Sequence, residues 1–229
     1  MARMIKVLLI AAGAFVALFL LAAILLYLFF DPNDFRDDIA NKVREQTGRE
    51  LSIEGDISLD IFPWLAVEVG KASLGNASGF GDTPMASFDS ASFSVRLMPA
   101  ILRQEVEVGA ADIVALSLNL EVNQNGRDNW SDLLPEDSSD EPAEGGAASG
   151  GLDVNSVQIV DAKISYSDRQ TGDLIVVDQA NLNIGRLKDD GSAVPVDATL
   201  NFDMQPAGMS GTVSLKTSMV FESASGELR

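Results

Sequence analysis

Carboxylates are the most plentiful groups in this chain that could do chemistry, since 34 Asp and Glu residues stand against 16 Lys and Arg. The chain contains no His and no Cys, which excludes Ser-His-Asp and Cys-His catalysis, imidazole or thiolate metal sites and disulfide bonds. A hydrolase with paired carboxylates is the enzyme class that this composition leaves open. Most of the acids alternate with apolar residues or lie in linkers, where solubility explains them. We therefore expect a protein that is not an enzyme, without catalytic residues or a cofactor.

Two acidic turns, 123–128 (NQNGRD) and 189–191 (DDG), superficially resemble calcium-binding loops. Neither has the ligand spacing or the closing Glu that such a loop requires, so both are interpreted as hairpin turns and no metal site is predicted. Gly79-Phe80-Gly81 is not followed by a helix, as a phosphate-binding loop would be. It is also predicted to be a turn.

The formal net charge of −18 at pH 7 bears on possible partners. The few basic residues are scattered singly along the chain and form no patch. A surface this negative repels the phosphate backbone of nucleic acids, so we expect no nucleic-acid partner.

The strongest regular pattern belongs to the apolar residues, which alternate with polar ones in 57–61, 65–69, 93–97, 116–122, 162–166, 194–202 and 213–221. Such alternation is typical of antiparallel strands with one dry and one wet face, and about ten strands follow it. The dry face either closes into a sandwich or barrel, or stays partly open as an apolar groove that can bind acyl chains. The candidate groove residues are Leu116, Leu118, Leu120, Val122, Ile164, Tyr166, Leu200, Phe202, Val213 and Leu215.

One short helix precedes these strands. Asp31-Pro32-Asn33-Asp34 is a typical helix start, with a capping side chain, an early Pro and acids in the first turn. Phe35, Ile39 and Val43 recur at helical spacing, and Thr47-Gly48 can end the helix. The sequence predicts an amphipathic helix of about 13 residues that packs against the following sheet.

A repeat connects two distant strands. Residues 111–127 align without gaps on 157–173, with identities at Ile113 and Ile159, Val114 and Val160, Gln124 and Gln170, and Gly126 and Gly172. Each copy is predicted to be a strand that runs into a Gly-bearing turn. The repeat suggests a stacked sheet built from similar hairpins.

An uncharged apolar run extends from Val7 to Phe30. As a helix it is about 36 Å long, enough to cross a hydrocarbon core of about 30 Å. A cleaved signal peptide would have a shorter core and a small-residue cleavage site, which this run lacks. Arg3 and Lys6 precede the run and several Asp residues follow it, so we expect a cytoplasmic N-terminus and an exported remainder.

The segment 135–151 (PEDSSDEPAEGGAASGG) is acidic, rich in Gly, Ala and Ser, and without apolar periodicity. It is predicted to be a flexible linker or long loop. The expected organisation is a cytoplasmic tip and membrane anchor over 1–30, a β region with the amphipathic helix over 31–134, the linker over 135–151, and a continuing β region over 152–229.

Several short motifs, in order over about residues 1–200, resemble those of the AsmA family. They are Phe30-Asp31-Pro32-Asn33-Asp34 after the apolar run, Thr47-Gly48-Arg49, Gly55-Asp56-Ile57, Phe62-Pro63-Trp64, Leu74-Gly75-Asn76-Ala77 with Gly79-Phe80-Gly81, Asn125-Gly126-Arg127-Asp128-Asn129-Trp130, and Tyr166-Ser167-Asp168 with Thr171-Gly172. Members of the family are usually several times longer, so this chain is expected to be a fragment or a short variant.

The resemblance implies a single-pass protein of the bacterial inner membrane with a periplasmic, groove-forming sheet, related to bridge-like lipid-transfer proteins. The expected mostly β fold has a transmembrane helix, a short amphipathic helix and a long twisted antiparallel sheet that forms an open apolar groove. The implied partner is phospholipid, and the implied role is phospholipid transport or outer-membrane homeostasis. The alternative is an envelope assembly or scaffold factor that binds outer-membrane proteins through its sheet edges.

Overall fold

The computed structural model describes residues 30–60, 64–96, 107–133, 153–188 and 191–220. The chain forms two compact units, Met1–Phe35 and Arg36–Arg229. The predicted membrane anchor and the predicted linker lie outside the described residues, apart from Phe30. In the part of the chain that is described, no helix is long and apolar enough to cross a membrane.

The predicted helix is confirmed. A 3-10 turn, η1 (Pro32–Phe35), comes directly before α2 (Arg36–Thr47). Asp31 caps the start, since its Oδ1 accepts a hydrogen bond of 2.8 Å from the backbone N–H of Asn33. Gly48 ends the helix in the left-handed conformation (φ 68°), and its N–H donates to the Arg44 carbonyl. Within α2, Val43 is half-buried whereas Ile39 is 41% exposed, so only part of the predicted apolar stripe is covered.

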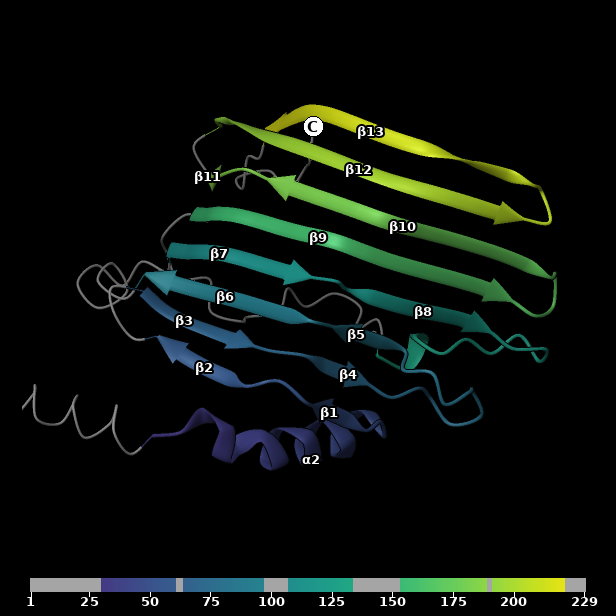
Figure 1. Cartoon of the computed structure of the whole chain (residues 1–229), viewed down its shortest axis with the longest axis horizontal. Helices are drawn as coiled ribbons and strands as arrows, with labels where there is room; N and C mark the ends of the chain where they lie inside the picture. Colours follow the sequence, from purple (N-terminus) through teal and green to yellow (C-terminus); the bar gives the residue numbers. More distant parts are fainter. Residues whose placement is uncertain (1–29, 61–63, 97–106, 134–152, 189–190, 221–229) are drawn as a thin grey trace, which may run out of the picture. The chain divides into compact units, whose positions relative to one another are not determined.

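The rest of the described chain is one twisted sheet of thirteen strands (Figure 1). The strands are β1 (Leu51–Ile53), β2 (Ile57–Asp60), β3 (Trp64–Val69), β4 (Ala72–Leu74), β5 (Ala86–Phe88), β6 (Ser90–Arg96), β7 (Glu107–Val114), β8 (Ser117–Val122), β9 (Asp153–Asp168), β10 (Asp173–Ile184), β11 (Leu187–Lys188), β12 (Ala193–Gln205) and β13 (Met209–Val220). A second 3-10 turn, η2 (Ser131–Leu133), follows β8.

The sheet is mixed, and the prediction of a purely antiparallel sheet was wrong. β9 runs parallel to both β7 and β8, which lie end to end along its edge, whereas its other edge pairs antiparallel with β10 (Figure 1). Parallel neighbours need a crossover of about a dozen residues or more, and the chain between β8 and β9 is long enough to supply one. Alternation alone does not reveal strand direction, because each strand shows one dry and one wet face in either arrangement.

A line of irregular residues crosses the sheet, and we call it the crease. It separates β1 from β2, β4 from β3, β5 from β6 and β8 from β7, and it continues into β9 and β10 as register shifts. Three non-glycine residues on this line, Ala115, Asp161 and Gln179, have φ values of 54°, 55° and 49°. At the other end of the line Gly55 and Gly70 approach closely, so that a Cβ on Gly55 would lie 2.3 Å from the backbone N of Lys71.

The two sides of this sheet end differently. Beside β1 lies α2, which contacts that strand (Figure 1). Ion pairs join Arg36 to Asp56 and Lys71 to Glu54 near this side, each at 2.8 Å. At the other side, β13 is hydrogen-bonded to β12 over its whole length and to no other strand among the described residues.

Candidate functional site

The strand registers bring the predicted groove residues onto one face, which we call the apolar face. Leu118 lies beside Ile164, which opposes Val177, which in turn opposes Phe202. Directly opposed residues of neighbouring strands point to the same side of a sheet. Four strands therefore contribute one continuous apolar row.

The next row toward the Gly-bearing turns is apolar as well. Leu120 lies beside Tyr166, Tyr166 opposes Ile175, and Ile175 opposes Met204. The ring of Trp130 packs against Tyr166 with ring centroids 6.1 Å apart. Trp130 therefore packs at the end of this row.

All but one of the remaining groove candidates lie on the same face at its margins. Leu200 opposes Val213, and Leu215 opposes Ala198. Leu116 lies in the crease, where its carbonyl accepts a hydrogen bond from the N–H of Lys163. Val122 lies beside Asp168, which opposes Asp173. The apolar face therefore ends at the row of Val122, close to the turns.

The apolar face extends across the crease to residues that the candidate set did not include. One row there is formed by Leu59, Val67, Phe93, Ala111, Val157, Ile184 and Val196. The alternation in 57–69 and 93–97 already indicated part of this row. β10 had no clean signal, because the bulge at Gln179 shifts the alternation between Val177 and Leu182.

Much of the apolar face is open to solvent. Val67, Phe93, Val213, Leu215 and Met209 are 38–56% exposed, and only seven apolar residues are buried in the described part of the chain. No Asp, Glu, Lys or Arg belongs to the three rows that end at Val196, Phe202 and Met204. An exposed apolar surface of this kind is typical of a site that binds an apolar ligand, a membrane or another protein.

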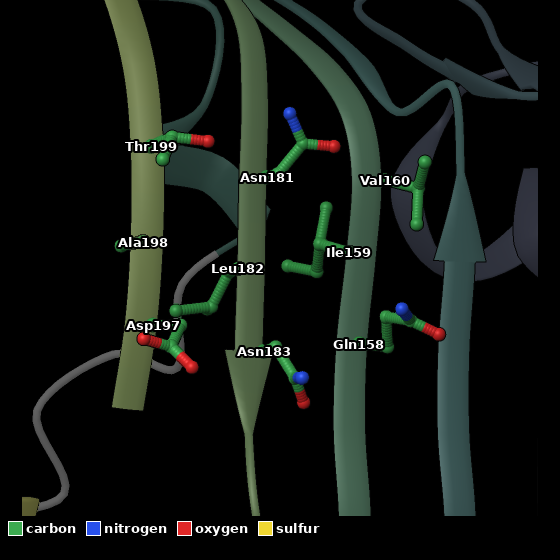
Figure 2. A pocket seen from close by; sticks show the side chains of 9 residues that line it. All are labelled: Gln158, Ile159, Val160, Asn181, Leu182, Asn183, Asp197, Ala198 and Thr199. Atoms are coloured by element: carbon green, nitrogen blue, oxygen red, sulfur yellow. The ribbon is translucent and has the colours of Figure 1, made fainter. Parts of the chain in front are cut away.

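The opposite face of the sheet is polar where Gln158 opposes Asn183 and Asn183 opposes Asp197. A small hollow lies at the crease (Figure 2), and its lining includes the apolar residues Ile159, Val160, Leu182 and Ala198. It has a volume of about 130 Å³ and is lined by segments of β9, β10 and β12, with Gln158, Asn181, Asn183, Asp197 and Thr199 as its polar side chains. Sites for small organic ligands are typically about 300–1,000 Å³. The hollow is therefore too small to be the main site.

A buried polar cluster joins three of the motifs that resemble the AsmA family. The Arg49 side chain is 1% exposed, and its guanidinium donates to Asp132 at 2.5 Å, to the Asn129 carbonyl at 2.8 Å and to the Met85 sulfur. The Asn129 side chain accepts from the Glu121 N–H and donates to the Asn119 carbonyl and to Asn76. Because Arg49 and Asn129 are buried and both bind groups from separate turns, we interpret the cluster as a structural clasp between the turns.

The turn at 123–128 is held by its own side chains, as predicted for a hairpin turn. Asn123 Oδ1 accepts hydrogen bonds from the N–H groups of Asn125 and Arg127. Asp128 Oδ1 accepts from the N–H groups of Trp130 and Ser131 at 3.0 and 2.7 Å. Partial burial raises the pKa of the Asp128 carboxyl, but these hydrogen bonds outweigh it and hold the pKa below its ordinary value. Asp128 is thus occupied in capping the turn.

Carboxylates form no metal centre in the described part of the chain, where no three potential ligands gather closely enough to hold an ion. Asp189 and Asp190 of the second acidic turn lie outside the described residues. The turn at Gly79-Phe80-Gly81 is confirmed, with Gly79 at φ 91° and the Phe80 N–H donating to the Ala77 carbonyl.

Comparison with known proteins confirms the resemblance to the AsmA family that the short sequence motifs indicated. A model of the AsmA family matches residues 1–220. Protein AsmA of Escherichia coli (strain K12) is 32% identical over 79 residues, which is 34% of this chain and 12% of that relative. The matched stretch is thus a small part of the relative, and no solved structure matches the chain significantly. Because the family match covers nearly the whole sequence, from the apolar run to the end of β13, the chain belongs to the AsmA family.

Proposed function

We propose that this protein is an anchored component of the bacterial envelope that binds the acyl chains of phospholipids on the apolar face of its sheet, for lipid transport or outer-membrane homeostasis. The observation that carries the proposal is the exposed apolar face, with Phe93 and Leu215 each 48% exposed. Family membership supports a role in the envelope.

Binding on this face requires only contact between apolar groups. Each methylene of an acyl chain that leaves water contributes about 0.8 kcal/mol. The rows on both sides of the crease lie on one face, so a chain that crosses several strands meets apolar side chains throughout. The headgroup needs no partner on this face and stays in water, and the proposed role needs no catalytic residue.

The proposal places residues 7–30 in the inner membrane as a single-pass anchor, with a cytoplasmic N-terminus and the remaining chain in the periplasm. The uncharged apolar run and the acids that follow it support this orientation.

Because the chain has no Cys, the orientation can be tested with single cysteines and a maleimide that does not cross membranes. Ala207→Cys, in the exposed turn before β13, is expected to react in cells with a permeable outer membrane, and Ala2→Cys only after lysis. Equal reaction of both before lysis would contradict the orientation.

Lipid binding is tested on the full chain purified in mild detergent. Mass spectrometry of the extracted protein is expected to find phospholipid in at least stoichiometric amount. Phe93→Asp puts a charge on the apolar face at an exposed position and is expected to lower the bound lipid several-fold. Thr199→Asp adds the same charge on the polar face and serves as the matched control.

Circular dichroism and thermal unfolding establish that both variants fold. If folded Phe93→Asp retains as much lipid as Thr199→Asp, the apolar face is not the binding site. If the unmodified chain carries no lipid beyond that bound by an unrelated single-pass protein, lipid binding itself is refuted.

A further inference from the structure

We infer that the exposed edge of β13 pairs antiparallel with β13 of a second copy of this chain, about a two-fold axis at Ser214. The first argument is the sequence of the strand. Residues 209–219 read MSGTVSLKTSM, which is nearly the same in both directions about Ser214. Antiparallel pairing about that centre opposes Met209 to Met219, Ser210 to Ser218 and Val213 to Leu215.

The second argument is the regularity of the edge. β13 pairs with β12 without a register shift from Met209 to Val220, whereas β10 is bulged on both of its sides. Bulges, prolines and charges are the devices by which proteins protect strand edges from pairing. Within β13 there is no Pro, and the one ionisable residue is Lys216, which lies 3.5 Å from Asp197 of its own sheet. The other side of the sheet differs, because α2 lies beside β1 and the crease interrupts the edge between β1 and β2.

The third argument is charge. A chain with a net charge of −18 repels a second copy, so a self-pairing surface must itself be free of acids. β13 contains no Asp or Glu over its twelve residues. In the register about Ser214, Lys216 opposes Thr212 of the second copy and does not meet its own equivalent.

The pairing also continues the apolar face. Met209, Val213, Leu215 and Met219 lie on that face, because they oppose Met204, Leu200, Ala198 and Val194. A two-fold axis perpendicular to the sheet keeps the apolar faces of both copies on the same side. Val213 and Leu215, which are 45% and 48% exposed, would then each gain an apolar neighbour across the new pair. This inference does not depend on lipid binding.

The test uses single cysteines in the full chain in detergent, since the native chain has none. In the proposed register Ser214 opposes Ser214 of the second copy with Cβ atoms about 4.5–5.5 Å apart, close enough for a disulfide after a small shift. Ser214→Cys is therefore expected to form a covalent dimer under mild oxidation. Ser210→Cys alone is the matched control, because the two copies of residue 210 would lie about 27 Å apart.

A mixture of Ser210→Cys and Ser218→Cys is expected to give the crossed dimer, which fixes the register. Since two strongly negative chains repel each other, the yield of the Ser214→Cys dimer is expected to rise with salt concentration. The inference is overturned if folded Ser214→Cys stays monomeric, as it would if another segment or another protein occupied the edge. It is also overturned if Ser210→Cys cross-links as readily, since the contact would then be unspecific.

Discussion

Ala115, between β7 and β8, and Asp161 of β9 adopt the same left-handed backbone conformation at corresponding points of the repeat. They are 46 residues apart in sequence, with φ values of 54° and 55°, and the Ala115 N–H donates a 2.8 Å hydrogen bond to the carbonyl of Val160. The same offset of 46 residues relates β7 to β9 and β8 to β9 throughout their pairing. The internal repeat of the sequence is therefore the register of the sheet.

This equivalence continues past the strands. Gly126 and Gly172, also 46 residues apart, both take positive φ values in the turns that follow. The side chain of Gln170 donates a hydrogen bond of 3.4 Å to the carbonyl of Gln124, its counterpart in the repeat. Two copies of one strand-and-turn unit thus lie side by side and bend at the same residue.

The first prediction concerns the crease. An alanine in the left-handed region is strained by its Cβ, so Ala115→Gly is expected to stabilise the protein by about 0.5–1 kcal/mol despite the greater freedom of glycine in the unfolded chain. Ala111→Gly, in the regular part of β7, is expected to destabilise by about 1 kcal/mol. Urea unfolding of the two variants measures both effects. A loss of stability in Ala115→Gly equal to that in Ala111→Gly would contradict the strain.

The second prediction concerns the close approach of two chain segments at Gly55. A Cβ there would lie 2.3 Å from the backbone N of Lys71 and 2.6 Å from Gly70, so the backbone must move. Gly55→Ala is expected to cost about 2–3 kcal/mol. Gly81→Ala is the control, since a Cβ there meets nothing within 4 Å, and it is expected to leave the thermal midpoint nearly unchanged. Similar midpoints for both variants would contradict the contact.

The parts of the fold that depend on the spacing of apolar residues along the chain were predictable from the sequence. Alternation located β2, β3, β6, β8, β9, β12 and β13, and the cap at Asp31 and the stop at Gly48 located the helix. Strand direction was not predictable from alternation, which is the same for parallel and antiparallel neighbours. The repeat contained that information, because two gapless copies of one strand can pair in parallel with every equivalent residue aligned.

The site was predictable only as a set of apolar residues. Alternation assigns Leu118, Ile164 and Phe202 to dry faces, but their placement in one row depends on long-range register. The clasp around Arg49 could not be predicted from the sequence for a different reason. Arg49, Asn76 and Asn129 are polar residues far apart in sequence, and local pattern gives no sign that folding buries them together. Their occurrence in separate motifs of one family was the signal that could have linked them.

The third prediction concerns this clasp. Asn129→Ala removes the partner of the Glu121 N–H and leaves buried groups unsatisfied, so a loss of about 3 kcal/mol is expected. Arg49→Met is expected to cost about 2 kcal/mol, because Asp132 is half exposed and water can replace part of the ion pair. Asn125→Ala, at an exposed position of the neighbouring turn, is the control and is expected to change stability by less than about 0.5 kcal/mol. Chemical denaturation provides the comparison, and equal stability of the Asn129 and Asn125 variants would refute the clasp.

The fourth prediction concerns the pH dependence of the turn at Asp128. Burial raises the pKa of this carboxyl, but hydrogen bonds from the N–H groups of Ser131 and Trp130 favour the ionised form more strongly, so its pKa in the folded state lies below the ordinary 3.8. A lowered pKa means that the ionised carboxylate stabilises the fold above this ordinary pKa, which the unfolded chain has, and that this contribution disappears as the pH falls through the folded pKa. Asp128→Asn, which cannot ionise, is therefore expected to unfold at a lower temperature than the parent at pH 7, and its unfolding temperature is expected to approach that of the parent below about pH 4.

Asn125→Ala is the control because it changes no titratable group. The difference in unfolding temperature between Asn125→Ala and the parent, its offset, should therefore be the same at pH 7 and at pH 3. Thermal unfolding monitored by circular dichroism between pH 7 and pH 3 measures both offsets, and an Asp128→Asn offset that stayed constant or grew toward low pH would show that the charge does not stabilise the turn.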